Sequence, residues 1–401
     1  MLEDRGTITL TGVQALSSRI HDALLARNDA SDAMFAREAT RLARVCREMS
    51  ERFLRGGRLL AFGRGPCATD AQHVSVEFVH PVIVGKRALP ALDLSIAFAQ
   101  WAPAICRPDD IAMGFGPPGG DPEVSAVLAE LRARGALTLA LSGRDADYSL
   151  EEPSSDPFIH QELVEILYHT LWESVHVFFE HHQMGHDVGD AGFLYPFLGQ
   201  DKQDTTSAID DVAKSIEMKA HDVVILREKI AAGQSDRIAR AAMAMHERLA
   251  MGGKLIFFGN GGSATDANDW AIDCVAPPAG QRPIPAISLS LEPANISAIA
   301  NDVGTEVVFV RQLIAHADAE DVAVALSTSG GSANIIAALI EARKRGLLTV
   351  AVLGYDGGEI LRRGLADWTL VVPCDYIPRI QEVQASMYHV LREAIEALDH
   401  G

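Results

Sequence analysis

The sequence has little basic charge for its size. Its 401 residues include 35 lysines and arginines against 54 aspartates and glutamates, for a formal net charge of −19. A surface that binds nucleic acid needs a stripe of basic residues. The excess of acidic residues therefore argues against nucleic acid as a partner. A small anionic ligand is still compatible with it, because the free N–H groups at a helix N-terminus can bind an anion.

Cysteines and long apolar runs are also scarce. The five cysteines are odd in number and have no CxxC spacing, which indicates reduced thiols in a cytosolic protein. The opening MLEDRGTITL has neither a basic n-region nor a long apolar run, so no signal peptide is expected. No stretch offers 18 unbroken apolar residues, so no membrane span is expected. These absences predict a cytoplasmic protein without a membrane partner.

What the sequence does contain is the same loop twice. AFGRGPCATDA (61–71) and FFGNGGSATDA (257–267) share Phe-Gly, a later glycine and Ala-Thr-Asp-Ala. Four more pairs follow in the same order: ALPALDLS (88–95) with PIPAISLS (283–290), DDIAMGFGPPGG (109–120) with EDVAVALSTSGG (320–331), RARGALTLALSG (132–143) with RKRGLLTVAVLG (343–354), and HQELVEILYH (160–169) with IQEVQASMYH (380–389). The chain is therefore predicted to be a tandem duplication, here called copy one and copy two.

Each copy alternates short apolar runs with helical patterns. In copy two the expected strands are KLIFFG, PAISLS, VAVALS, LLTVAVLG and WTLVVP. A helix is expected from about Ser263, and SANIIAALIEARKRG has apolar residues at helical spacing. This alternation predicts an α/β fold in which each copy is a doubly wound parallel sheet.

The expected domains follow the duplication. Residues 1–186 form a degenerate first domain, 187–205 a linker containing Gly, Pro and Asp, and 206–401 the second domain. Long helices at about 12–55 and 206–250 precede the two sheets.

Two loops of copy two combine glycines with hydroxyl side chains where a strand ends and a helix begins. They are GNGGSATDA (259–267) and LSTSGGSAN (326–334). Helix N-termini carry free N–H groups, and small hydroxyls add donors, so the expected ligand is a phosphate on a small molecule. Neither loop has the P-loop lysine or the GxGxxG pattern. The alternative is that these residues only cap helices. The predicted phosphate and substrate residues are Asn260, Gly261, Gly262, Ser263, Ser327, Thr328, Ser329 and Ser332.

Copy two resembles a sugar isomerase (SIS) domain of the phosphoheptose isomerase type. The resemblance rests on GNGGSATDA, SAIANDVG, LSTSGGSANII, GYDGGEI and RIQEVQASMYH, which span most of 205–401, and copy one resembles the family more faintly. It implies a three-layer α/β/α sandwich, a phosphorylated sugar on the two serine-rich loops, and oligomers with sites between subunits, here a dimer of two-domain chains. It also implies aldose–ketose isomerisation through a cis-enediol, as in the conversion of sedoheptulose 7-phosphate to heptose 7-phosphate.

The resemblance also implies a zinc ion held by a His and a Glu after the first loop and by a Gln and a His on the last helix. In copy one these positions hold His73, Glu77, Gln161 and His169. Each pair shares one helix face, and nitrogen with oxygen donors suits Zn²⁺. In copy two the same positions hold Asp269, Asp273, Gln381 and His389, a weaker set for zinc.

The residues suited to binding phosphate show the opposite distribution: they are present in copy two and replaced in copy one. Copy one has Arg64, Pro66 and Cys67 in its first loop, and Asp121 replaces Ser332, so a carboxylate would repel phosphate. The hypothesis is that copy two binds phosphate while copy one retains the ionisable ligands. The alternative is that copy one has decayed into a scaffold.

The roles expected from this resemblance are a general base, a general acid and a set of substrate contacts. Glu77 is the expected base and His169 the expected acid, with His389 and Gln381 as a second pair from copy two. Glu292 is a candidate for the family's acid after the Pro-Ala-Ile run. Pro378 replaces the aspartate that usually precedes Arg-Ile-Gln-Glu, which weakens the case for sedoheptulose 7-phosphate in particular. The alternative function is a non-catalytic SIS scaffold or regulator of the DnaA initiator-associating type.

Overall fold

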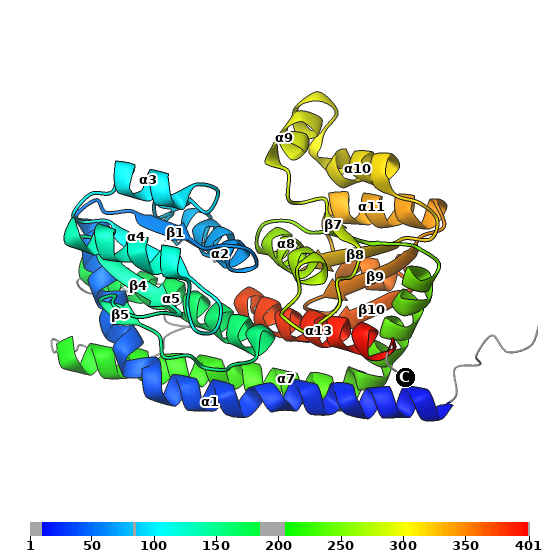
Figure 1. The fold of residues 1–401 in the computed structure, drawn as a ribbon, viewed down its shortest axis with the longest axis horizontal. Coiled ribbons are helices and arrows are strands. Elements are labelled where there is room, and N and C mark those ends of the chain that lie inside the picture. Colours follow the sequence, from blue (N-terminus) through cyan, green and yellow to red (C-terminus); the bar gives the residue numbers. More distant parts are fainter. Residues whose placement is uncertain (1–9, 83–85, 185–204, 400–401) are drawn as a thin grey trace, which may run out of the picture. The chain divides into compact units, whose positions relative to one another are not determined.

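Two parallel five-stranded sheets organise the chain (Figure 1). The computed structural model describes residues 10–82, 86–184 and 205–399. None of the helices in these ranges is both long and apolar enough to cross a membrane. The prediction of an α/β fold with one parallel sheet in each copy is confirmed.

The first sheet has the order β2-β1-β3-β4-β5. Its strands are β1 (Leu59–Phe62), β2 (Ala91–Asp93), β3 (Ile111–Phe115), β4 (Leu137–Leu141) and β5 (Tyr148–Ser149). The helices of this copy are α2 (Cys67–Val79), α3 (Phe98–Ile105), α4 (Pro122–Ala133) and α5 (Pro157–Met184).

The second sheet has the equivalent order β10-β9-β8-β6-β7. Its strands are β6 (Leu255–Phe258), β7 (Ala286–Ser288), β8 (Val322–Ser327), β9 (Leu348–Leu353) and β10 (Trp368–Val371). Its helices are α8 (Gly262–Val275), α9 (Pro293–Asp302), α10 (Val308–His316), α11 (Ala333–Lys344), α12 (Gly358–Arg362) and α13 (Ile377–Ala397), with a 3₁₀ turn η2 (Thr305–Val307). The strands that the sequence predicts in this copy are all present.

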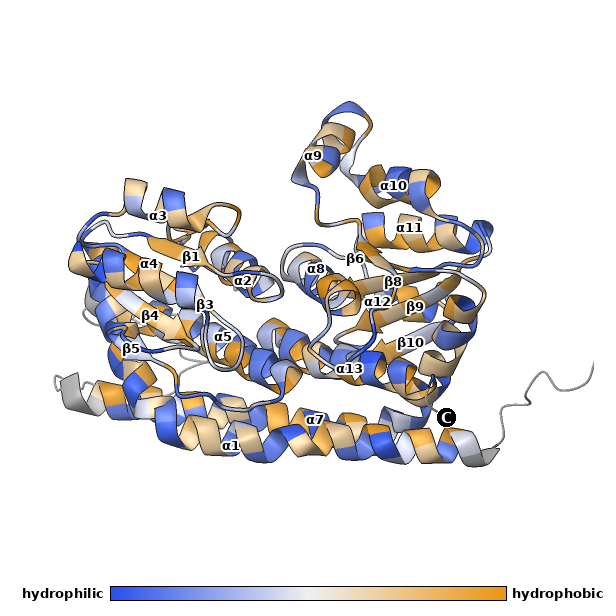
Figure 2. Cartoon of the chain, viewed as in Figure 1, coloured by the Kyte–Doolittle hydropathy of each residue, from blue (hydrophilic) through white to orange (hydrophobic). Residues whose placement is uncertain are grey.

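Helices cover both faces of each sheet, so the central strands are buried on both sides. Every residue of β1, β3, β6 and β8 is buried. On one face of the second sheet Ile256, Ala323 and Ala351 pack with Ile335 and Leu339 of α11. On the other face the Trp270 ring of α8 stacks on the Tyr388 ring of α13, with centroids 5.2 Å apart. The hydropathy colouring shows β8 and β9 as hydrophobic strands (Figure 2).

Two long helices, α1 (Leu10–Leu54) and α7 (Thr205–Ala250), each belong to two compact units. The unit containing the second sheet comprises Met1–Asn28 and Ile225–Gly401, and the unit containing the first sheet comprises Asp29–Val224. Each unit thus includes a helical segment that the duplicated sequence assigns to the other copy. The predicted linker at 187–205 lies, except for its last residue, outside the described residues.

Candidate functional site

The two predicted phosphate loops follow neighbouring strands. Strands β6 and β8 pair in parallel, with Leu255 opposite Val322. After β6 the chain forms β7 on one side of β6, and it later forms β8 on the other side of β6. Ligands of open α/β sheets bind outside the carboxyl ends of the strands at such a switch point. The loops at Gly259 and Ser327 both begin there.

The first loop is held tightly against the start of α8. A side chain at Gly259 would overlap the backbone carbonyl of Ser263. The Ser290 hydroxyl donates to the Gly259 carbonyl and also accepts from the Gly259 N–H. Gly261 has φ +56°, a conformation that L side chains rarely adopt, and it precedes the first helical residue. Because these positions are glycines, the backbone of the loop can approach the first turn of α8 closely.

The second loop is fixed by its own hydroxyls. Ser327 Oγ accepts from the Gly330 N–H at 3.1 Å, and Ser329 Oγ accepts from the Gly331 N–H at 3.2 Å. The Gly354 N–H donates to the Thr328 carbonyl at 2.9 Å. The conformation of this loop is therefore set by hydrogen bonds before any ligand is present.

An amide pair joins the two loops. Asn260 Nδ2 donates to Asn334 Oδ1 at 2.9 Å, and Asn334 Nδ2 donates to Asn260 Oδ1 at 2.8 Å. Helices α8 and α11 have Gly261 and Ser332 as N-caps, and neither makes a side-chain capping bond. Two helix starts without a side-chain cap are thus held beside each other, an arrangement that can bind an anion. Asn334 was not among the residues predicted from the sequence, although its position two residues after Ser332 in a phosphate-type loop was a usable signal.

Copy one fills the corresponding position with its own carboxylate. Asp121 Oδ1 accepts from the Glu123 N–H at 2.8 Å and from the Val124 N–H at 3.1 Å, capping α4. Arg64 Nη1 pairs with Glu123 at 3.0 Å and lies 3.8 Å from Asp121. The carboxylate of Asp121 therefore already caps this helix start, and its repulsion of a phosphate stays a prediction.

Asp121→Ala should lower the free energy of unfolding by about 1 kcal/mol, since it removes an N-cap that accepts from two backbone N–H groups. Chemical denaturation of the full chain measures the change. Glu123→Ala is the matched control and should cost less, because its exposed ion pair with Arg64 contributes little. Equal losses in the two variants would contradict the capping role.

Copy one also carries a buried cluster of imidazoles and carboxylates. His73 of α2 and His169 of α5 place their Nε2 atoms 3.4 Å apart. Ligand atoms of His73, Glu165 and His169 all lie within 4.8 Å of one another. Two nitrogens bound tetrahedrally at about 2.05 Å would be about 3.3 Å apart, so the observed separation fits a zinc ion.

The structure brings His73 and His169 together as predicted and adds Glu165, which the sequence analysis missed. Glu165 precedes His169 by one helical turn on the largely apolar α5, a spacing that could have identified it. Glu77 Oε1 lies 3.9 Å from His73 Nε2, and its side chain is 1% exposed. Gln161 is buried two turns before His169 on α5.

In the equivalent cluster of copy two, the side chains are hydrogen-bonded to one another or to Tyr388. Asp269, Asp273 and His389 have ligand atoms within 4.8 Å of one another. Tyr388 donates its hydroxyl to Asp269 at 2.6 Å, and His389 Nε2 lies 3.1 Å from Asp273 Oδ2. Burial raises the pKa of the neighbouring Cys274 thiol, and the two aspartates raise it further against the opposing effect of Arg392. This site is oxygen-rich and suits zinc less well than the copy-one cluster.

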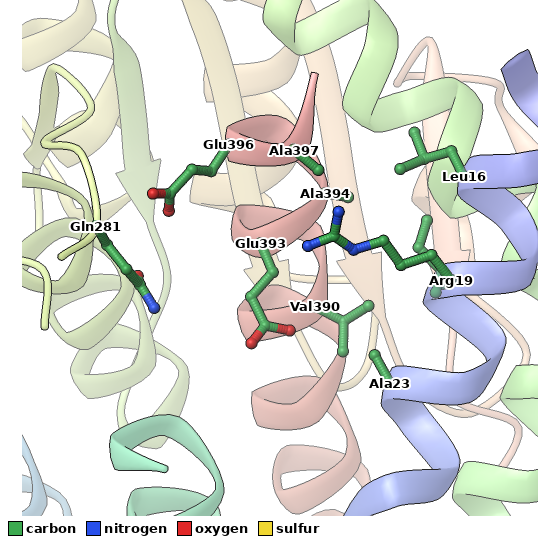
Figure 3. A pocket seen from close by; sticks show the side chains of 10 residues that line it. Leu16, Arg19, Ala23, Gln281, Val390, Glu393, Ala394, Glu396 and Ala397 are labelled. Atoms are coloured by element: carbon green, nitrogen blue, oxygen red, sulfur yellow. The ribbon is translucent and has the colours of Figure 1, made fainter. Parts of the chain in front are cut away.

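Two other features of the second-sheet unit include none of the residues of these loops and clusters. Glu292 is exposed at the start of α9 and accepts from Asn295 Nδ2 at 3.1 Å. A cavity of about 480 Å³ is lined by the first turns of α1 and the end of α13, and it includes none of the predicted site residues. Arg19 of α1 extends toward α13 there, and Glu393 and Glu396 line the same space (Figure 3).

Comparison with known proteins places copy two in one family. The family model described as the SIS domain matches residues 220–354. Phosphoheptose isomerase from Geobacter sulfurreducens is 39% identical over 189 residues, which cover 47% of this chain and 97% of that protein. Phosphoheptose isomerase from Sulfurimonas denitrificans is 45% identical over 144 residues, covering 36% of this chain and 73% of that protein.

A solved structure matches nearly the whole chain. Tagatose-6-phosphate ketose/aldose isomerase from Escherichia coli covers 95% of this chain and 93% of its own, with a TM-score of 0.55 and 14% identity. At this identity the match concerns the fold alone, and that fold spans both copies. The family-model match and the long matches to phosphoheptose isomerases show that the chain belongs to the SIS-domain family.

Proposed function

We propose that this protein is an aldose–ketose isomerase of phosphorylated sugars. The observation that carries the proposal is the joined pair of helix starts in copy two, fixed by the Asn260–Asn334 amide pair. Relatives named phosphoheptose isomerase that align over almost their full length support the same class of reaction. Binding of the phosphate would supply energy that positions the reacting carbons of the sugar.

The reaction moves a proton between C1 and C2 through a cis-enediol. We assign Glu77 as the base that takes the proton from one carbon and returns it to the other, and His169 as the group that donates a proton to the carbonyl oxygen and takes one from the neighbouring hydroxyl. His389, beside Asp273, is the corresponding candidate in copy two. A zinc ion held partly by His73 and Gln161 would supply polarisation of the carbonyl group.

The proposed substrates are sugar phosphates of five to seven carbons, among which sedoheptulose 7-phosphate is the reference. Incubation of the full chain with a panel of C5–C7 ketose and aldose phosphates, followed by analysis of both sugars, tests the proposal. Interconversion of any pair supports it. Phosphate-dependent binding without turnover on any member would contradict it and favour a non-catalytic SIS scaffold or regulator.

Ser329→Asp should weaken binding of a turned-over sugar phosphate by a few kcal/mol, because it places a charge against the ligand phosphate and removes a hydroxyl donor. Titration calorimetry with the wild-type chain and the variant gives the affinities. Ser297→Asp, an exposed change on α9, is the control and should bind normally. Unchanged affinity in Ser329→Asp would place the phosphate elsewhere.

A further inference from the structure

Two carboxylates reach the histidine pair of copy one, from opposite helices. Glu77 lies on α2 with His73, and Glu165 lies on α5 with His169. Only one of these two carboxylates is needed as the base of the proposed isomerase chemistry, which leaves the other available as a metal ligand.

We infer that Glu165 is the carboxylate ligand of the copy-one metal site, and that Glu77 is left as the proton acceptor. This inference rests on the proposed function only for the second role. Glu165 and His169 are one turn apart on α5, so they approach one point from the same side. Glu165 forms the mutually close trio with the two imidazoles, whereas Glu77 is not a member of that trio.

The duplication supports the assignment independently. Alignment of HQELVEILYH with IQEVQASMYH places Ala385 opposite Glu165. In copy two Asp269 replaces His73, so the second histidine is absent from that position. The extra carboxylate therefore occurs only in the copy that has both imidazoles. By contrast, the position of Glu77 keeps an acid in both copies, as Asp273 in copy two.

The trio is also buried. His73, Glu165 and His169 are 2%, 4% and 0% exposed. Two imidazole nitrogens and one carboxylate oxygen are donors of the kind found in catalytic zinc sites, and Gln161, which is also predicted as a ligand, is buried on the same helix as Glu165 and His169.

Metal binding by matched variants of the full chain tests this inference without any activity measurement. The chain is stripped with a chelator and titrated with Co²⁺, whose visible absorption is intense when it is four-coordinate, and competition with Zn²⁺ gives the zinc affinity. Glu165→Gln should weaken binding at least tenfold and reduce the four-coordinate spectrum. Glu77→Gln should keep the affinity within about threefold of the wild type and leave the spectrum unchanged.

A control separates ligation from folding. Glu162→Gln removes another buried carboxylate from α5 and should bind metal normally. Glu165→Asp retains the carboxylate, and its far-ultraviolet circular dichroism should match that of the wild type with intermediate metal affinity. The inference is overturned if Glu77→Gln loses the metal and Glu165→Gln keeps it, or if the wild-type chain binds neither cation. An isomerase assay that fails on a metal-loaded chain would overturn the proposed function and leave the ligand assignment standing.

Discussion

Glu77→Gln is expected to lower kcat for sugar-phosphate isomerisation by about 10²–10⁴-fold while leaving substrate affinity nearly unchanged. The amide has almost the same shape as the carboxylate but cannot accept a proton from carbon. The Glu77 side chain is buried beside His73 in copy one. The proposed phosphate loops belong to copy two, so phosphate binding should persist in the variant. Steady-state kinetics on the best substrate of the panel, with calorimetry for affinity, measures both quantities.

The matched change in copy two decides which copy carries the chemistry. Asp273→Asn alters the residue that aligns with Glu77, and it removes the charged partner of His389. We expect a smaller loss of kcat for this variant than for Glu77→Gln. Full activity in Glu77→Gln together with lost activity in His389→Ala would place the catalytic groups in copy two and refute the division of labour between the copies.

The sheets were predictable because parallel strands buried on both faces leave a plain apolar signature. Runs such as VAVALS and LLTVAVLG contain few polar residues, and each became a strand within one or two residues of the expected bounds. The grouping of α1 and α7 was not predictable in this way. Their helical periodicity continues through Asn28 and Val224, where the compact units divide, so nothing local marks the change.

The candidate site was predictable where a motif fixes the backbone, and less so where single side chains meet across the fold. The glycine and serine pattern predicted two tight turns at neighbouring helix starts, because few other residues suit the positions of Gly259 and Gly330; phosphate binding by these loops stays a prediction. Asn334 and Glu165 each have a local signal in the sequence, but their contacts with Asn260 and His73 join residues distant in sequence and are visible only in the fold. Asp121 was identified as an obstacle to phosphate, but its capping of α4 depends on the backbone geometry of that helix start.

Gly330→Ala should lower the free energy of unfolding of the second-sheet unit by about 2–5 kcal/mol and sharply weaken sugar-phosphate binding. Gly330 has φ +60°, and a Cβ there would overlap the backbone carbonyl of Gly357. A flexible side chain could move aside, but this carbonyl belongs to the tight turn that begins α12. Relief of the overlap requires the loop containing Ser327 and Ser329 to shift, and these hydroxyls are the proposed phosphate donors.

Gly364→Ala is the matched control, because Gly364 has nearly the same φ, +59°, and an added Cβ there would meet no atom within 4 Å. It should lose about 1–2 kcal/mol from the left-handed conformation alone and bind substrate normally. Denaturant unfolding and calorimetry of both variants separate backbone strain from steric overlap. Equal stability losses, with sugar-phosphate affinity retained in Gly330→Ala, would mean that the loop can move without consequence, and the serine-rich loop would then not be the phosphate site.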